Sequence, residues 1–196
     1  MSDASKITAE EVLKIVMERG PEFAEQLAAA LNNAPDGQWI SGGEEAVRDS
    51  GQEFIRAAFK AALQRKVGAA DAAFPPPQTA NGKRYRNKGL QRTTYLTING
   101  RISVRRRWWY DPDAGSVAPI DDRLTPAGEN VTVGVRELAC RLNNDACSFR
   151  RAAENLARAA QIKMSAEQPR QVVERDGQRV LRAQGAGTDC AGDDGC

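Results

Sequence analysis

Nine basic side chains and no acidic one occur between Ala72 and Tyr110, and aromatic residues follow the last of them. The nine are Lys83, Arg84, Arg86, Lys88, Arg92, Arg101, Arg105, Arg106 and Arg107. A surface that carries one sign of charge, with aromatic rings at its edge, suits a partner of the opposite charge. The chemistry expected of this segment is therefore the binding of a polyanion, with nucleic acid as the first candidate.

The net charge of the whole chain, +2, conceals this segment. Residues 72–110 carry a net charge of +9, whereas residues 1–71 carry −4 and residues 111–196 carry −3. Such an uneven distribution indicates one charged working surface between regions that are close to neutral and serve packing.

The sequence offers little for catalysis or for metal binding. It has no histidine, and its four cysteines form no Cys-x-x-Cys pair, so a structural zinc site is not expected. The absence of histidine also removes the usual general base for a Ser or Cys nucleophile. No phosphate-binding loop and no nucleophile elbow occur, and we expect neither a cofactor nor an enzyme activity.

The cysteines and the apolar runs point to a cytoplasmic protein without a membrane partner. Cys140 and Cys147 lie seven residues apart in a helical pattern that favours buried small side chains. Cys190 and Cys196 would bridge only if oxidised, and the cytoplasm keeps thiols reduced. No apolar run is long enough to span a membrane, and the acidic N-terminus does not resemble a signal peptide.

A β-hairpin is predicted to position the basic side chains. Residues 94–98 are of β-forming type, and Asn99-Gly100 is the strongest signal for a two-residue hairpin loop. Residues 101–110 then return antiparallel to the first strand, and a basic arm over residues 79–89 precedes the hairpin.

The two-residue loop also predicts which side chains share a face. The expected cross-strand pairs are Ile98 with Arg101, Thr97 with Ile102, Tyr95 with Val104 and Thr93 with Arg106. One face then carries Tyr95, Thr97, Ile102, Val104 and Trp108, and the other carries Arg92, Leu96, Arg101, Arg105 and Arg107. Four guanidinium groups on one face favour phosphate binding. An acidic partner surface, or a solvated edge strand guarded by arginine, is the alternative.

Helices are predicted on both sides of the hairpin. A capping box that begins at Thr8 opens a helix that Gly20 ends, and Pro21 opens a second helix that runs to about residue 31. A third helix is expected over residues 44–66. Together these helices would serve as a scaffold or as an oligomerisation surface.

Three further helices are predicted over residues 132–143, 148–160 and 165–176, with a short turn before the last. This order resembles a helix-turn-helix unit, and residues 131–182 carry a net charge of +4. The last helix would present Gln168, Arg170, Gln171 and Arg175, which are residue types that read base edges or grip phosphates. An ordinary three-helix packing domain is the alternative. Residues 183–196 are expected to be disordered.

The expected fold class is α+β with four parts. They are an N-terminal helical region over residues 1–71, a basic arm and hairpin over 72–125, a helix-turn-helix-like domain over 126–182, and a tail over 183–196.

Several runs of the sequence resemble the N-terminal part of ISKra-type insertion-sequence transposases, over about residues 45–182. These runs are Lys88-Gly89-Leu90, residues 95–106, residues 108–110, residues 120–124, residues 134–139, and Ser165-Ala166-Glu167-Gln168 with Val172. The most specific part is the hairpin followed by Trp108-Trp109-Tyr110. Relatives often carry Cys-x-x-Cys-Gly after this triplet, but here residues 111–115 read Asp-Pro-Asp-Ala-Gly, without either cysteine.

The resemblance implies a bacterial mobile-element protein that binds double-stranded DNA at element ends, in the nucleoid. In that family a catalytic domain with an Asp/Asp/Glu metal triad follows, and we expect the chain to end before it, so no catalytic residue is assigned. We predict salt-dependent DNA contacts from Lys88, Arg92, Arg101, Arg105, Arg107, Trp108, Gln168, Arg170, Gln171 and Arg175. A homo-oligomer or a full-length transposase is a further expected partner. The alternatives are an oligomerisation or dominant-negative regulatory module, or a decayed open reading frame.

Overall fold

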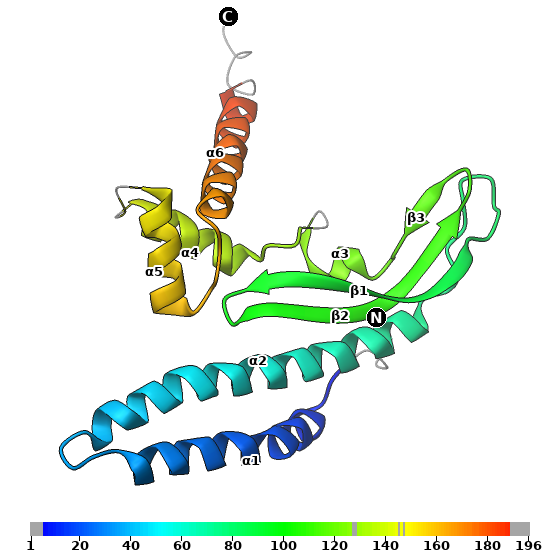
Figure 1. The fold of residues 1–196 in the computed structure, drawn as a ribbon. Coiled ribbons are helices and arrows are strands. Elements are labelled where there is room, and N and C mark those ends of the chain that lie inside the picture. The colour runs from blue at the N-terminus through cyan, green and yellow to red at the C-terminus, as the bar shows by residue number, and fades with distance from the viewer. Residues whose placement is uncertain (1–5, 127–128, 145, 147, 189–196) are drawn as a thin grey trace, which may run out of the picture. The chain divides into compact units, whose positions relative to one another are not determined.

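The computed structural model describes residues 6–126, 129–144, 146 and 148–188, and it confirms an α+β fold (Figure 1). The chain forms two compact units. The first comprises the residues up to Tyr95 and those from Ile102 to Asn130, and the second comprises Leu96–Arg101 and the residues from Val131 onward. The predicted helical region and most of the predicted hairpin region therefore lie in one unit, and the end of the hairpin lies in the other.

The first unit begins with a pair of antiparallel helices, α1 (Ala9–Asn33) and α2 (Trp39–Ala73). The predicted capping box is confirmed, because the Thr8 hydroxyl accepts from the amide of Glu11 and the Glu11 carboxylate accepts from the amide of Thr8. The predicted break at Gly20 is wrong, since α1 continues through Pro21.

Packing between the two helices explains why Pro21 does not end α1. Phe23 stacks on Phe54 of α2, with 5.6 Å between the ring centroids, just beyond the proline. Tertiary contacts of this kind offset the backbone hydrogen bond that a proline removes from a helix. The predicted start of the next helix is also wrong, since α2 begins at Trp39 instead of Glu44. Gly43 lies inside it at a point of close approach, where a Cβ atom would lie 3.0 Å from the Leu31 side chain.

A three-stranded antiparallel sheet follows, formed by β1 (Arg86–Thr97), β2 (Gly100–Asp111) and β3 (Gly115–Val117) in that order. The predicted hairpin is confirmed, but its register differs from the prediction by two residues. The hydroxyl groups of Thr94 and Ser103 form a hydrogen bond of 2.7 Å, so these two residues lie opposite each other.

The turn geometry explains this shift of register. The turn residues are Ile98 and Asn99, and Gly100 is already the first residue of β2, with φ +95°. A loop centred on Asn99-Gly100 would need positive φ at Asn99 as well, and of the described non-glycine residues only Gln161 has it. A shift of two residues leaves the alternation unchanged, so each side chain keeps its predicted face.

One face of the hairpin packs on α2 and on the short helix α3 (Asp121–Leu124). Tyr95, Ile102 and Val104 are buried there against Leu63 and Leu124. A second cluster, of Val67, Ala70 and Ile120, continues this core along α2. The apolar face predicted from the sequence is therefore the face that the fold buries.

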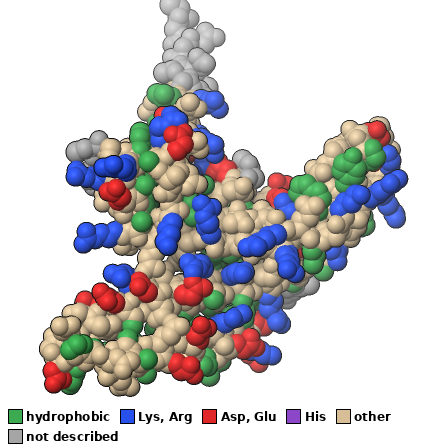
Figure 2. Space-filling model, in the orientation of Figure 1, with side chains coloured by type: hydrophobic (Ala, Val, Ile, Leu, Met, Phe, Trp, Pro, Cys, Tyr) green, Lys and Arg blue, Asp and Glu red, His purple; other side chains and the backbone are tan. Residues whose placement is uncertain are grey.

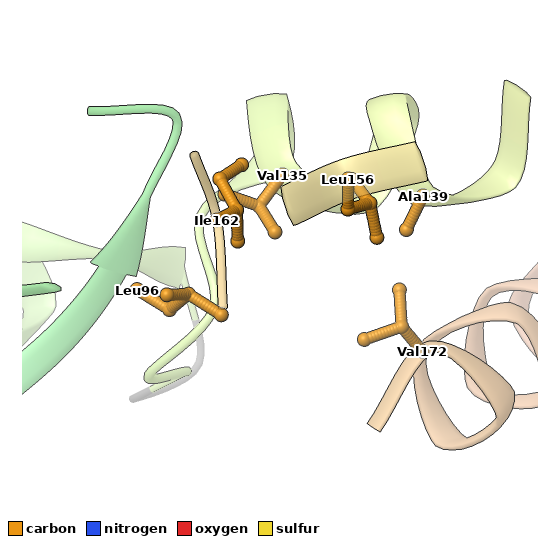
Figure 3. Close-up of a cluster of buried hydrophobic side chains, with 6 residues drawn as sticks. All are labelled: Leu96, Val135, Ala139, Leu156, Ile162 and Val172. Carbon is orange, nitrogen blue, oxygen red and sulfur yellow. The ribbon is translucent and has the colours of Figure 1, made fainter. Parts of the chain in front are cut away.

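The second unit packs three helices, α4 (Val133–Asn144), α5 (Phe149–Ala160) and α6 (Glu167–Thr188), around one core. Figure 3 shows this core, in which Leu96 lies with Val135, Ala139, Leu156, Ile162 and Val172. Ser148 caps α5 as predicted, accepting from the amide of Arg151. Six residues, with Gln161 in a left-handed conformation, join α5 to α6.

The C-terminal helix is longer than the sequence predicts. It was expected to end near residue 176, with disorder from residue 183, but α6 continues to Thr188. The rest of the tail, with Cys190 and Cys196, lies outside the described residues, as does Cys147. Cys140 is half-buried, and burial raises the pKa of its thiol. Over the part of the chain that the structure describes, no helix is both long and apolar enough to cross a bilayer.

Candidate nucleic-acid interface

Two polar side chains of α2 fix β2 along its edge away from β1. The amide group of Gln64 spans Arg105, with its oxygen accepting from the Arg105 N–H at 2.7 Å and its nitrogen donating to the Arg105 carbonyl at 2.9 Å. Asp71, which is buried, accepts from the backbone N–H of Arg107. The backbone groups of Arg105 and Arg107 therefore point away from β1.

Arg92 and Arg105 lie opposite each other across the two strands. The Thr94–Ser103 hydrogen bond sets the register, and two residues further along it pairs Arg92 with Arg105. The backbone N–H and C=O groups of Arg105 bind Gln64, so Arg92 and Arg105 form a non-hydrogen-bonded pair of the antiparallel ladder. In such a pair the Cα atoms lie about 4.5 Å apart. The two guanidinium groups thus start from the closest spacing that an antiparallel sheet offers.

Both side chains of this pair are exposed, and neither forms an ion pair within the described ranges of the chain. Like charges directly opposite each other destabilise a sheet unless an anion lies between them. Residues 72–110 contain no acidic side chain that could provide one. The arrangement suits an anion that comes from outside the chain, such as a phosphate.

The neighbouring Arg106 has a different role. It lies on the packed face, is 7% exposed, and donates to both carboxylate oxygens of Asp121, from Nη2 at 2.8 Å and from Nε. Its guanidinium also lies 4.9 Å from the ring centroid of Trp108. The ion pair and the ring contact make Arg106 a structural residue.

Arg107 and Trp108 are less available than the sequence indicates. Both are half-buried, and the Arg107 guanidinium lies 3.5 Å from the Asp71 carbonyl while its N–H binds the Asp71 carboxylate. Of the four guanidinium groups predicted to share the outward face, that of Arg107 is therefore engaged by α2.

Lys88 is exposed and lies near the aromatic triplet. Its Nζ lies 5.4 Å from the ring centroid of Tyr110. Gly89, which follows it, has φ +83°, a conformation that favours glycine.

Sequence reasoning missed two exposed cations of this region as site residues, Arg84 and Arg86. The prediction began the first strand near Thr93, whereas β1 begins at Arg86. Residues 86–92 contain a single apolar side chain, Leu90, so the alternation that signals a strand is absent from this stretch.

Lys83, which precedes β1, is neutralised by carboxylates. Lys83 pairs with Asp111 at 3.0 Å and with Asp113 at 3.2 Å. The ammonium group of Lys83 lowers the pKa of Asp111, assisted by the backbone N–H groups of Ala114 and Asp113. These contacts hold the turn over residues 111–115, which follows the aromatic triplet.

In the second unit Arg101 is exposed, but the predicted site residues of α6 are mostly engaged. Arg170 binds Glu167 at 2.9 Å and Glu174 at 2.7 Å, and Gln171 donates to Glu167 at 3.1 Å. These contacts lower the pKa of Glu167, with the hydrogen bond from Arg170 as the main cause. Arg170 and Gln171 lie on α6 as predicted, but glutamates of the same helix engage both side chains, and their contact with DNA stays a prediction.

The other two predicted residues of α6 differ from each other. Gln168 is half-buried, and its side-chain oxygen accepts from the Ser165 N–H at 3.0 Å, which fixes the start of the helix. Arg175 is exposed, and no ion pair within the described ranges involves it. Of the four site residues predicted on this helix, Arg175 is the one whose side chain stays available to bind a partner.

Figure 2 shows Lys and Arg side chains gathered over β1 and β2, whereas acidic side chains are frequent on α1 and α2. The described residues contain no group of three or more His, Cys, Asp or Glu side chains that could hold a metal ion. The basic surface of the sheet is thus the arrangement with the clearest chemistry.

Comparison with known families gives a match over most of the chain. The model of an uncharacterised protein family, UPF0236, matches residues 39–188. The matched region begins at the first residue of α2 and ends at the last residue of α6, so α1 lies outside it. A search of curated proteins found no match.

Proposed function

The chain belongs to the uncharacterised protein family UPF0236, and we propose that it binds double-stranded DNA through the basic side chains of β1 and β2. The observation that carries the proposal is the Arg92–Arg105 pair, exposed and without a carboxylate partner in the described structure. A phosphate placed between two guanidinium groups replaces a repulsion by two charge-assisted hydrogen bonds.

The anchoring of β2 supports this role. Gln64 and Asp71 hold the backbone at Arg105 and Arg107, so the Arg105 side chain extends from a fixed strand. A rigid base lowers the conformational entropy that binding would otherwise cost. Contacts of this type bind the phosphate backbone and carry no base sequence, so we expect binding to depend strongly on salt and weakly on sequence.

We place this binding in DNA transposition, because residues 45–182 resemble the N-terminal part of ISKra-type transposases. The DNA would then be the ends of a mobile element. In this proposal the chain contributes binding, and no catalytic residue is assigned to it. An acidic protein surface is the competing partner, and the experiment below separates the two.

The test measures the binding of the full chain to a fluorescent duplex by anisotropy, at salt concentrations from about 50 to 200 mM. We expect the logarithm of the affinity to fall linearly with the logarithm of the salt concentration. The double substitution Arg92→Gln/Arg105→Gln removes two phosphate contacts, and should reduce that slope by about 2 and weaken binding equally for unrelated sequences.

The matched control is Arg141→Gln/Arg170→Gln, which removes the same charge from two arginines that pair with carboxylates of their own helices. It should leave the slope within about 0.5 of the unmodified chain. Equal losses in both variants would reduce the effect to net charge and overturn the assignment to the sheet. No binding to duplex DNA at 50 mM salt would overturn the function itself.

A further inference from the structure

The large apolar side chains that remain exposed are concentrated on α1 and α2. Of the described residues of this kind, nine belong to these two helices: Val12, Leu13, Met17, Leu31, Trp39, Ile40, Val47, Ile55 and Phe59. Leu13 and Met17 are 59% and 68% exposed, and such exposure is informative only where the residues belong to a larger apolar patch. A contiguous apolar patch on a helical pair marks an interaction surface.

Six of these nine side chains lie on one face of the helical pair. Contacts between the helices fix which sides face each other: Arg65 donates to Glu11 at 2.8 Å, and Phe23 stacks on Phe54. Each residue turns a helix by about 100°. On this rule Leu13, Met17 and Leu31 of α1 lie on the same side of the contact between the two helices as Val47, Ile55 and Phe59 of α2. We call these six residues the apolar hairpin face.

The opposite face of the helical pair carries more polar side chains. An open groove of about 770 Å³ runs along it, and its lining mixes Gln26, Gln38, Ser41, Glu45 and Glu53 with alanines and Pro35. The helical pair is therefore two-sided, with one face that suits solvent and one that does not.

The two helices present complementary shapes on the apolar hairpin face. Between Met17 and Leu31, the same side of α1 carries only small residues, Gly20, Ala24 and Ala28. The facing stretch of α2 carries the large residues Val47, Ile55 and Phe59. A row of small side chains on one helix leaves room for a row of large side chains on another, so α1 of one chain fits against α2 of a second copy.

The charges at the rim of the face favour the same pairing. Next to the apolar stripe, α1 carries Glu10, whereas α2 carries Lys66. The internal contacts place Glu11 level with Arg65, so a two-fold axis parallel to the helices sets Glu10 beside Lys66 of the second copy. The other two-fold arrangement stacks α1 on α1 and opposes Glu to Glu.

We propose that the chain forms a symmetric dimer in which two copies join their apolar hairpin faces into a four-helix bundle, each α1 packed antiparallel on the α2 of the other copy. A helix of the length of α1 spans about 37 Å, and two adjacent helices span roughly 20 Å. The face therefore covers about 700 Å² per copy, close to the roughly 800 Å² per partner of a stable interface. This proposal does not rest on DNA binding.

The test is the molar mass of the full chain by light scattering after size exclusion, with sedimentation equilibrium for the dissociation constant. The unmodified chain should be a dimer. Met17→Glu/Phe59→Glu places four carboxylates in the symmetric interface, and should raise the dissociation constant at least about 100-fold. Helix content by circular dichroism should be unchanged, because both side chains are exposed in the single chain.

A matched control and a charge exchange sharpen the test. Gln26→Glu/Ser41→Glu adds the same charge on the polar face, and should leave the dimer intact. Glu10→Lys should weaken the dimer by about 3- to 10-fold, and adding Lys66→Glu should restore it, since the pair occurs twice by symmetry. A monomeric unmodified chain would overturn the proposal. So would a dimer that survives Met17→Glu/Phe59→Glu, and failure of the exchange to restore the dimer would overturn the α1-on-α2 arrangement.

Discussion

The arginines of the β1–β2 hairpin and those of α6 face opposite surroundings. On α6, Arg170 has a glutamate three residues before it and another four residues after it, and helical geometry brings both to its guanidinium group. On the sheet, the residues opposite and beside Arg92 are Arg105, Thr94 and Ser103, and no acidic residue occurs anywhere between residues 72 and 110.

This difference teaches that the availability of a cation depends on the element that carries it. A helix pairs residues that are close in sequence, so its charges are neutralised by local composition. A hairpin pairs residues that are distant in sequence, so a segment without carboxylates stays unneutralised over its whole exposed face. The net charges, +9 for residues 72–110 and +4 for residues 131–182, therefore understate the contrast in available charge.

The largest expected effect separates Arg106 from its neighbour Arg105. Asp121→Ala leaves the buried guanidinium of Arg106 without its carboxylate, and should lower the free energy of unfolding by about 2–3 kcal/mol. Arg105→Gln removes an exposed charge, and should change it by less than about 0.5 kcal/mol. Chemical denaturation measures both values. Similar losses in the two variants would contradict the division into one structural and one available arginine.

A smaller effect is expected when the neutralising glutamates of α6 are removed. Glu167→Gln/Glu174→Gln releases Arg170, and should strengthen DNA binding about 3- to 10-fold at low salt. The control, Glu18→Gln/Glu22→Gln on α1, changes the net charge equally without releasing that arginine. If both double variants bind DNA equally well, pairing within α6 does not limit its cations, and the comparison with the sheet fails.

The smallest effect concerns the turn that joins β2 to β3. Because Lys83 lowers the pKa of Asp111, Lys83→Met should raise that pKa toward its usual value of about 3.9, as an NMR titration of the carboxyl group would show. The carboxylate stabilises the fold above the unfolded-state pKa, and this contribution is lost as the pH falls through the lower folded-state pKa. An unchanged pKa in the variant would contradict a role for the Lys83 contact.

Much of the fold follows from local signals in the sequence. The capping box at Thr8, the cap at Ser148 and the alternation of residues 94–104 each act over a few residues, and the structure confirms each of them. Gly20-Pro21 and Gly42-Gly43 were misleading, because packing between α1 and α2 decides there. A local rule reads these glycines and this proline as breaks, whereas the helices use two of the glycines for close approach.

The candidate site was predictable in outline but not in detail. The uncompensated charge of residues 72–110 is visible in the sequence, as is the face that Arg92 and Arg105 share. The capture of Arg107 by Asp71 joins residues 36 positions apart, and no spacing rule indicates it. The pairing of Arg170 with Glu167 and Glu174 follows from helical spacing, which residue types that suit DNA do not by themselves reveal.

The most direct test of the central claim follows individual arginine side chains by NMR while a duplex is added to the isotopically labelled full chain. The account predicts that the Nε–Hε signals of Arg92 and Arg105 shift first and furthest, and that the signal of Arg170 stays near its starting position. Large shifts at Arg170 and Arg175, with Arg92 and Arg105 unmoved, would contradict it.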